Sequence, residues 1–203
     1  MKNVIGLATA TLVLLVSAFF AARIGNPVIA NGCVTGRDAA EVRSGSLAGG
    51  NAQATRRATA ALESRSGSKL TGEATFTENK YGVAIRVKIK GATAGPHGVH
   101  LHENGDCSAA DAQSAGGHFN PDKTTHGAPT SDPHHSGDLG NITVGADGTG
   151  ELRLTVKGVT VGPGEHSVIG RALVVHAGAD DFKSQPAGNS GARFACGVVK
   201  AAN

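Results

Sequence analysis

Histidine stands out among the residues of this chain that can carry out chemistry. The sequence holds nine histidines, and His100 and His102 flank a single leucine in the segment "GVHLHENGDC". If this segment is a strand, both side chains project to the same face, because side chains alternate with a period of two. Imidazole is the commonest metal ligand, so the pair can reach one ion. A single His-x-His pair is also typical of two exposed polar residues, and alone it is a weak indication of a metal site.

Further candidate ligands follow in the segment between residues 103 and 138. "GGHFNP" contains His118, "THGAP" contains His126, and "HHSGDLGN" contains His135 and Asp138. Three imidazoles and a carboxylate within 21 residues are enough for a closed tetrahedral zinc site. A solvated polar loop seldom collects such a set, so these motifs strengthen the prediction of a metal centre.

Short strands separated by turns are predicted after about residue 57. In residues 83–90, "VAIRVKIK", apolar and polar side chains alternate, which predicts one buried face and one wet face. Seven other segments are also predicted to be strands: 58–64, 70–78, 98–102, 139–144, 151–156, 167–176 and 194–200. Hairpin signals such as Asp147-Gly148 lie between them, and no long amphipathic stretch interrupts them. The predicted fold is all-β, an eight-stranded Greek-key β-sandwich or flattened barrel.

Two long connections separate these strands. They span residues 103–138 and 177–193, and the first of them carries most of the candidate ligands. Loops of this length in a compact domain are usually functional or disordered. We therefore expect both to be functional loops.

Six motifs occur in the order and at nearly the spacing found in copper/zinc superoxide dismutases. They are "GPHGVHLHENGDC", "GGHFNP", "HGAP", "HSGDLGN", "GEHSVIGRALVVHAGADD" and "GNSGARFACGVV". The likeness runs from about Arg57 to Val199, and the chain resembles an exported bacterial member of that family. The resemblance implies that superoxide is converted to oxygen and hydrogen peroxide by Cu(II)/Cu(I) cycling, which protects the cell envelope from external superoxide.

The resemblance also implies a role for each candidate ligand. The implied copper ligands are His100, His102, His118 and His176. The implied zinc ligands are His118, His126, His135 and Asp138. Six histidines, one of them shared, and one aspartate fill two shells of four, which argues against a copper-only relative. The shared His118 must then bind through both ring nitrogens.

Two further residues receive roles from the resemblance. Asp180 matches the family's carboxylate that links a copper-ligand and a zinc-ligand histidine and fixes their tautomers. Arg193, in "GNSGAR", resembles the family's anion-guiding arginine beside the open copper position, whereas without that context it is typical of an ordinary surface arginine. The segment before it holds Lys183 but also Asp180 and Asp181, and it is shorter than in typical eukaryotic relatives. The source of electrostatic steering is therefore left open.

Three histidines are expected to have no metal-binding role. His97 and His166 match structural positions of the family, and we expect both to hydrogen-bond to the backbone. His134 is expected to point away from its neighbour His135 and to lie on the surface.

Export from the cytoplasm is predicted from residues 1–30. Nineteen uncharged residues, 4–22, follow a single basic residue, which indicates a signal peptide or a membrane anchor. Small residues up to Ala30 suit cleavage there, and lipidation of Cys33 is a third alternative. Residues 31–56 lack periodicity and are predicted to be a flexible tether, followed by a superoxide dismutase-like domain at 57–203.

Cysteine usage and net charge restrict the environment and the partners. Outside the reducing cytoplasm Cys107 and Cys196 can persist as a disulfide, with Cys33 as the odd cysteine, although the sequence alone does not prove this pairing. The net charge of +3 includes Lys2 and Arg23, so the chain after residue 30 carries about +1, too little for nucleic-acid binding. The expected partner is the superoxide anion. The periplasm or cell envelope is the expected location, membrane attachment through the N-terminus stays open, and so does the choice between monomer and homodimer.

Two other classes of function compete with the enzyme. An exported copper/zinc-binding module would keep the ligands without turnover, and a structural sandwich domain would hold no metal. Arg193 at the position expected for an anion guide favours the enzyme.

Overall fold

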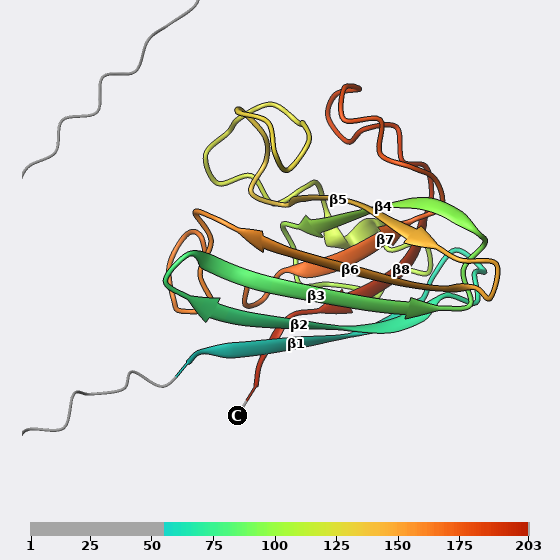
Figure 1. Cartoon of the computed structure of the whole chain (residues 1–203), viewed down its shortest axis with the longest axis horizontal. Helices are drawn as coiled ribbons and strands as arrows, with labels where there is room; N and C mark the ends of the chain where they lie inside the picture. Colours follow the sequence, from blue (N-terminus) through green and yellow to red (C-terminus); the bar gives the residue numbers. More distant parts are fainter. Residues whose placement is uncertain (1–54, 203) are drawn as a thin grey trace, which may run out of the picture. The chain divides into compact units, whose positions relative to one another are not determined.

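The computed structural model describes residues 55–202 of the chain (Figure 1). The leader predicted at 1–30 and the tether predicted at 31–56 lie outside the described residues, apart from Thr55 and Arg56. The described elements are β1 (Arg57–Ser64), β2 (Thr71–Asn79), β3 (Gly82–Lys90), β4 (Gly95–His102), the 3-10 helix η1 (Gln113–Ala115), β5 (Asp138–Val144), β6 (Thr149–Val156), β7 (Ala172–His176), β8 (Arg193–Val198) and β9 (Lys200–Ala201). Within residues 55–202, no helix has the length and apolar character that crossing a membrane requires.

The strands close into an antiparallel barrel. Their order is β2-β3-β6-β5-β4-β7-β8-β1, and β1 completes the circuit by pairing with β2. Because β3 neighbours β6 while β4 lies between β5 and β7, two connections cross between non-adjacent strands, as in a Greek key. The predicted eight-stranded all-β fold is confirmed, with the short β9 added beside β1.

Alternating side chains build the core of the barrel. In β3, Val83, Ile85, Val87 and Ile89 are at most 4% exposed, and the residues between them are half-buried, as the alternation predicts. Asp147 closes the β5–β6 hairpin, because its Oδ1 accepts the Thr149 N–H at 3.0 Å. The predicted Asp-Gly turn is therefore present.

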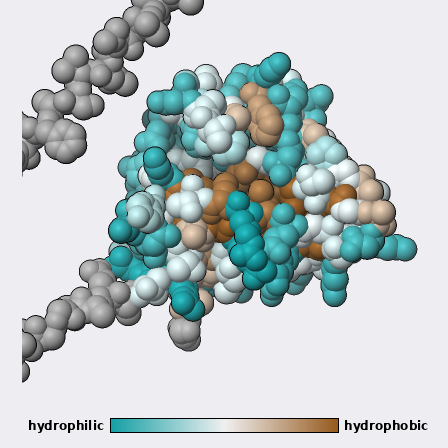
Figure 2. Space-filling view, in the orientation of Figure 1, coloured by the Kyte–Doolittle hydropathy of each residue, from teal (hydrophilic) through white to brown (hydrophobic). Residues whose placement is uncertain are grey.

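The barrel opens where β5 and β6 separate. These strands pair only at Val144 and Gly150, and Leu152 and Leu154 of β6 are partly buried against the core. Figure 2 shows hydrophobic residues at the surface in a band across the middle of this face, with hydrophilic residues around it.

Two predicted strands have different bounds in the structure. The segment 167–176 is a strand only from Ala172, because Ser167 Oγ accepts the Ile169 N–H at 3.2 Å and turns the chain before it. The segment 194–200 is divided at Val199, whose N–H donates to Arg171 O at 2.8 Å. β8 therefore pairs with β7, and β9 pairs with β1.

The two long loops start from neighbouring strands. Residues 103–137 follow β4 and residues 177–192 follow β7, and β4 pairs with β7. The predicted disulfide is present and joins Cys107 in the first loop to Cys196 in β8. Arg65 also fixes the backbone of Cys107, since its Nε donates to Cys107 O at 2.9 Å. The first loop is therefore anchored to β8, the strand that follows the second loop.

Candidate metal centre

Two adjacent strands carry three of the candidate ligands. His100 and His102 lie on β4, and His176 ends β7, where Val99 pairs with Val175. Val99 and Leu101 pack in the core, so the alternating histidines project from the outer side of the sheet. All three histidines are at most 4% exposed, because the loops cover this part of the sheet.

The first loop returns to β4 and places His118 beside these residues. The Phe119 N–H donates to Leu101 O at 2.8 Å, and the Leu101 N–H donates to Gly137 O at 2.9 Å. His118 forms an isolated bridge with His102. The loop therefore adds backbone hydrogen bonds alongside β4, and these set the position of His118.

The first cluster consists of four imidazoles. One ring nitrogen from each lies within 4.8 Å of the others, and the four residues are His100, His102, His118 and His176. The outer nitrogens are hydrogen-bonded: His102 Nδ1 donates to Gly116 O at 2.9 Å and His176 Nδ1 to Gly191 O at 3.2 Å.

The inner nitrogens of this cluster have no hydrogen-bond partner among the described residues. They are His100 Nδ1, His102 Nε2, His118 Nε2 and His176 Nε2. A buried polar atom without a partner is destabilising. A metal ion that accepts the lone pairs of all four nitrogens would remove this cost, so the residues present fit a bound copper ion.

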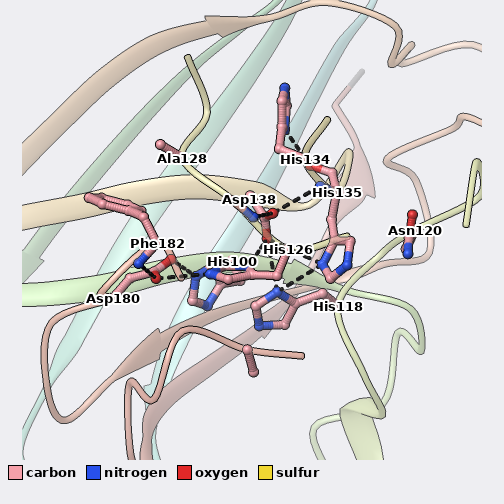
Figure 3. Close-up of polar contacts among 12 residues, drawn as sticks. His100, His118, Asn120, His126, Ala128, His134, His135, Asp138, Asp180 and Phe182 are labelled. Atoms are coloured by element: carbon pink, nitrogen blue, oxygen red, sulfur yellow. Dashed lines mark hydrogen bonds and ion pairs between the residues drawn. The ribbon is translucent and has the colours of Figure 1, made fainter. Parts of the chain in front are cut away.

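The second cluster contains three imidazoles and a carboxylate (Figure 3). Asp138 Oδ1 lies 2.9 Å from Nδ1 of both His118 and His126, and 3.4 Å from Nδ1 of His135. The other oxygen, Oδ2, accepts the N–H groups of Gly127 and His135 at 3.0 and 2.9 Å. Three nitrogens and one carboxylate oxygen are a donor set that suits zinc.

Asp180 connects the two clusters. Its Oδ2 accepts from His100 Nε2 at 2.8 Å, and its Oδ1 accepts from His126 Nε2 at 2.9 Å (Figure 3). Protons held at Nε2 leave Nδ1 of both rings free to bind a metal. Asn141 fixes the Asp180 backbone, because its side-chain amide exchanges two hydrogen bonds with it at 2.8 and 2.9 Å. Asn141 was not among the predicted site residues, although it ends the motif "HSGDLGN".

Burial keeps three ligands of the first cluster, His102, His118 and His176, neutral. It lowers the pKa of His118 to about 4 and that of His176 to about 3. The pKa of His102 also lies well below its ordinary value because the ring is desolvated. Imidazoles that stay unprotonated at neutral pH offer their lone pairs to a metal.

The carboxylates of the centre are ionised. Burial alone would raise the pKa of Asp138, but hydrogen bonds from His118 and His135 outweigh it and hold that pKa below its usual range. The pKa of Asp180 is lowered in the same way, against burial, by hydrogen bonds from His100 and the Phe182 backbone. Both carboxylates therefore remain acceptors at neutral pH.

Arg193 begins β8 and pairs with His176 across the sheet. Its Nη1 donates to Ala112 O and its Nη2 to Gly116 O, both at 2.8 Å. Burial lowers the pKa of Arg193, but a guanidinium stays protonated at neutral pH. Both carbonyls lie in the first loop, which the disulfide anchors, so a fixed positive charge stands beside the first cluster.

A cavity of about 670 Å³ leads to this cluster, and His102, His118, His176 and Arg193 are among the residues that line it. Among the described lining residues, Arg193 and Glu103 are the charged ones besides histidine, and Lys183 does not line the cavity. Among these residues, Arg193 therefore supplies the positive charge of the cavity lining beside the candidate copper site.

The other histidines lie outside both clusters. The ring nitrogens of His97 contact His176 O and Thr93 O at 2.9 and 2.8 Å, as expected. His134 Nδ1 donates to His135 O at 2.7 Å. The prediction that His166 hydrogen-bonds to the backbone is wrong. Its ring faces the side chain of Asp122 in the first loop, with Nε2 3.6 Å from Asp122 Oδ1. Its Nδ1 has no partner in the described structure.

Comparison with known proteins agrees with this geometry. The family model described as copper/zinc superoxide dismutase matches residues 70–199. The chain is 44% identical over 146 residues to a superoxide dismutase [Cu-Zn] of Deinococcus radiodurans, covering 66% of this chain and 80% of that protein. It is 42% identical over 149 residues to one of Caulobacter vibrioides, covering 70% and 85%.

Two further relatives extend the comparison. An extracellular superoxide dismutase [Cu-Zn] of Brugia pahangi is 44% identical over 151 residues, covering 70% of this chain and 74% of that protein. A crystal structure of the clock protein EA4 is similar with a TM-score of 0.65 at 38% identity, covering 71% of this chain and 93% of that one. With a family model that matches most of the barrel and relatives above 40% identity, this chain belongs to the copper/zinc superoxide dismutase family.

Proposed function

We propose that this superoxide dismutase converts superoxide at the first cluster, with copper held by its four imidazoles and zinc held by the second cluster. Two superoxide anions and two protons yield one molecule of oxygen and one of hydrogen peroxide. Copper and zinc are the cofactors of the family. The observation that carries the proposal is the set of four buried imidazole nitrogens that face one another without hydrogen-bond partners.

The residues divide the work as follows. Copper, when bound, supplies the alternate one-electron oxidation and reduction of superoxide, and zinc has no accessible redox state. His118 faces the first cluster with Nε2 and the second with Nδ1. Because His118 lines the cavity, its Nε2 can hold a proton and pass it to the reduced product. Asp180 keeps His100 and His126 in one tautomer while this proton moves.

Arg193 captures the substrate. Superoxide is a small anion that offers few contacts, so its rate of arrival depends on the electric field in the cavity. The two carbonyls that hold the guanidinium leave its charge beside His176 and His118 in the cavity wall.

A superoxide-decay assay on copper- and zinc-loaded protein tests this proposal. We expect Arg193→Ala to lower kcat/KM by roughly tenfold or more, as is typical when a steering charge is lost, without changing the metal content. Lys90→Ala removes the same charge from β3, outside the cavity lining, and should leave kcat/KM nearly unchanged. Equal low activity of wild type and Arg193→Ala, with both metals tightly bound, would favour a metal-binding module and overturn the proposal.

We further propose that the protein acts outside the cytoplasm, in the periplasm or cell envelope, against external superoxide. Residues 1–30 would be cleaved or kept as an anchor, residues 31–56 would link them to the domain at 57–203, and the domain acts as a monomer or homodimer. The apolar run at 4–22 and the similarity to the extracellular superoxide dismutase of Brugia pahangi support export. Mass spectrometry of the native N-terminus tests it, and an intact Met1 on protein purified from the cytoplasm would overturn it.

A further inference from the structure

Among the described residues, a single side chain makes the hydrogen bonds between the tip of the second loop, residues 181–189, and the first loop. Gln185 Oε1 accepts the His126 N–H at 2.9 Å, and Gln185 Nε2 donates to His126 O at 2.9 Å. The other hydrogen bonds of the tip in this part of the chain stay within the loop, for example from the Asp181 N–H to Gly188 O and from the Gly188 N–H to Ser184 O. Gln185 is thus the hydrogen-bonded link between the tip and the first loop.

These two hydrogen bonds hold the backbone of His126 at both its N–H and its C=O group. A carboxamide can satisfy an N–H and a C=O at once, as a neighbouring strand does. The ring of the same residue is held by Asp180, which accepts from His126 Nε2 at 2.9 Å. One loop therefore controls His126 at two points, and both contacts help to aim Nδ1 at the second cluster (Figure 3).

The tip is also a wall of the cavity. Gln185, Pro186 and Ala187 line it together with Arg193 and His118. A change in the position of Gln185 therefore reaches the substrate channel as well as the second cluster.

We propose that Gln185 is a positioning residue for the zinc half of the centre: its carboxamide fixes the backbone of His126 and ties the cavity wall to that ligand. This inference rests on the proposed assignment of zinc to the second cluster. By reciprocity of linked equilibria, Gln185 strengthens zinc binding and bound zinc steadies the loop tip to the same extent.

Metal titration of the full chain tests the first half of this linkage. We expect Gln185→Ala to weaken zinc binding by roughly tenfold in a chelator competition, the scale typical for partners that orient a ligand. Cobalt(II) at the second cluster should show an altered visible spectrum, because a displaced imidazole changes the ligand field. Gln185→Glu keeps the acceptor for the His126 N–H and should recover part of the affinity.

Gln113→Ala is the matched control. Gln113 is the same residue type and lines the same cavity, but its side-chain amide makes no hydrogen bond within residues 55–202. We expect wild-type zinc affinity and a wild-type cobalt spectrum from it. The melting temperature of each metal-free variant separates a general loss of stability from a loss of zinc affinity.

Trypsin cleavage after Lys183, an exposed residue of the tip, tests the second half. Zinc should slow this cleavage in the wild type, and Gln185→Ala should remove most of that protection. If the wild type binds zinc and Gln185→Ala matches it in affinity, cobalt spectrum and protection, the role of Gln185 is refuted while the proposed function stands. If the wild type binds no zinc, the zinc assignment itself fails, and this inference fails with it.

Discussion

Removing the disulfide between Cys107 and Cys196 should sharply lower the stability of the domain. The two cysteines are 89 residues apart, and the chain-entropy model gives about 4.6 kcal/mol for a loop of that length at 25 °C. Small domains have total stabilities of about 5 to 15 kcal/mol, so this is a large fraction. Alanine is the suitable replacement at position 196, because Cys196 is 1% exposed and packs with Ala172 and Val174.

Urea unfolding of the metal-free protein, with chelator present, measures this loss. Both proteins should carry Cys33→Ser, so that a third thiol cannot exchange with the pair. We expect Cys107→Ala/Cys196→Ala to lower the free energy of unfolding by about 3 to 5 kcal/mol and to raise the m-value, because the unfolded chain without the cross-link exposes more surface.

A second measurement keeps the reasoning testable if the metal-free variant is mostly unfolded. Saturating zinc and copper bind the folded state and stabilise it by mass action, so the same difference can then be measured between loaded proteins. A loss below about 1 kcal/mol with an unchanged m-value would refute the loop-entropy reasoning.

Two further predictions concern the centre itself. In the metal-free protein, burial lowers the pKa of His118 to about 4 and that of His176 to about 3, whereas both rings take up protons near pH 6.5 in the unfolded chain. The free energy of unfolding should therefore be highest above pH 6.5 and fall as the pH drops toward 4. Thermal melts in the presence of chelator check this. A melting temperature that stays constant or rises as the pH drops would contradict it. Gly188 has a φ of 64°, and a Cβ there would collide with Asp180 Oδ1 and lie 2.7 Å from His126 Nε2. Gly188→Ala should therefore displace the Asp180 carboxylate that connects His100 and His126, and lower the zinc content per chain. The far-ultraviolet circular dichroism should stay nearly unchanged. Full zinc occupancy in this variant would count against that role of Asp180.

Strand content was predictable where the signal is local. The alternation in β3 and the Asp-Gly turn before β6 depend on neighbours within a few residues, and the structure has both. The prediction failed at 167–171, where the apolar residues Val168 and Ile169 resemble a strand but Ser167 turns the chain. Residue type alone does not reveal that this segment leaves the strand, because the residues after the local turn are held by backbone contacts with a segment that lies about 30 residues further along the chain. Gly170, for example, donates its N–H to Val199 O at 2.9 Å.

Residue type and spacing indicated candidate ligands at the His-x-His pair and in the three motifs of the first loop, since imidazoles and carboxylates seldom gather in a few short motifs unless they bind a metal. His176 as a ligand, and the division of the ligands between copper and zinc, came from the resemblance to the family. The same information cannot say which ring nitrogen of His118 faces which cluster, or that Ala112 and Gly116 hold Arg193 by their carbonyls. Nor does it reveal Gln185, whose partner is the backbone of a residue 59 positions away.

The chemistry available to this chain thus follows from its residues alone, because only certain side chains can bind a metal. The arrangement that makes use of that chemistry follows from the closed barrel, because pairing of β4 with β7 brings His100 and His176 together from 76 positions apart. Contacts over such distances depend on the whole fold and leave no local trace in the sequence.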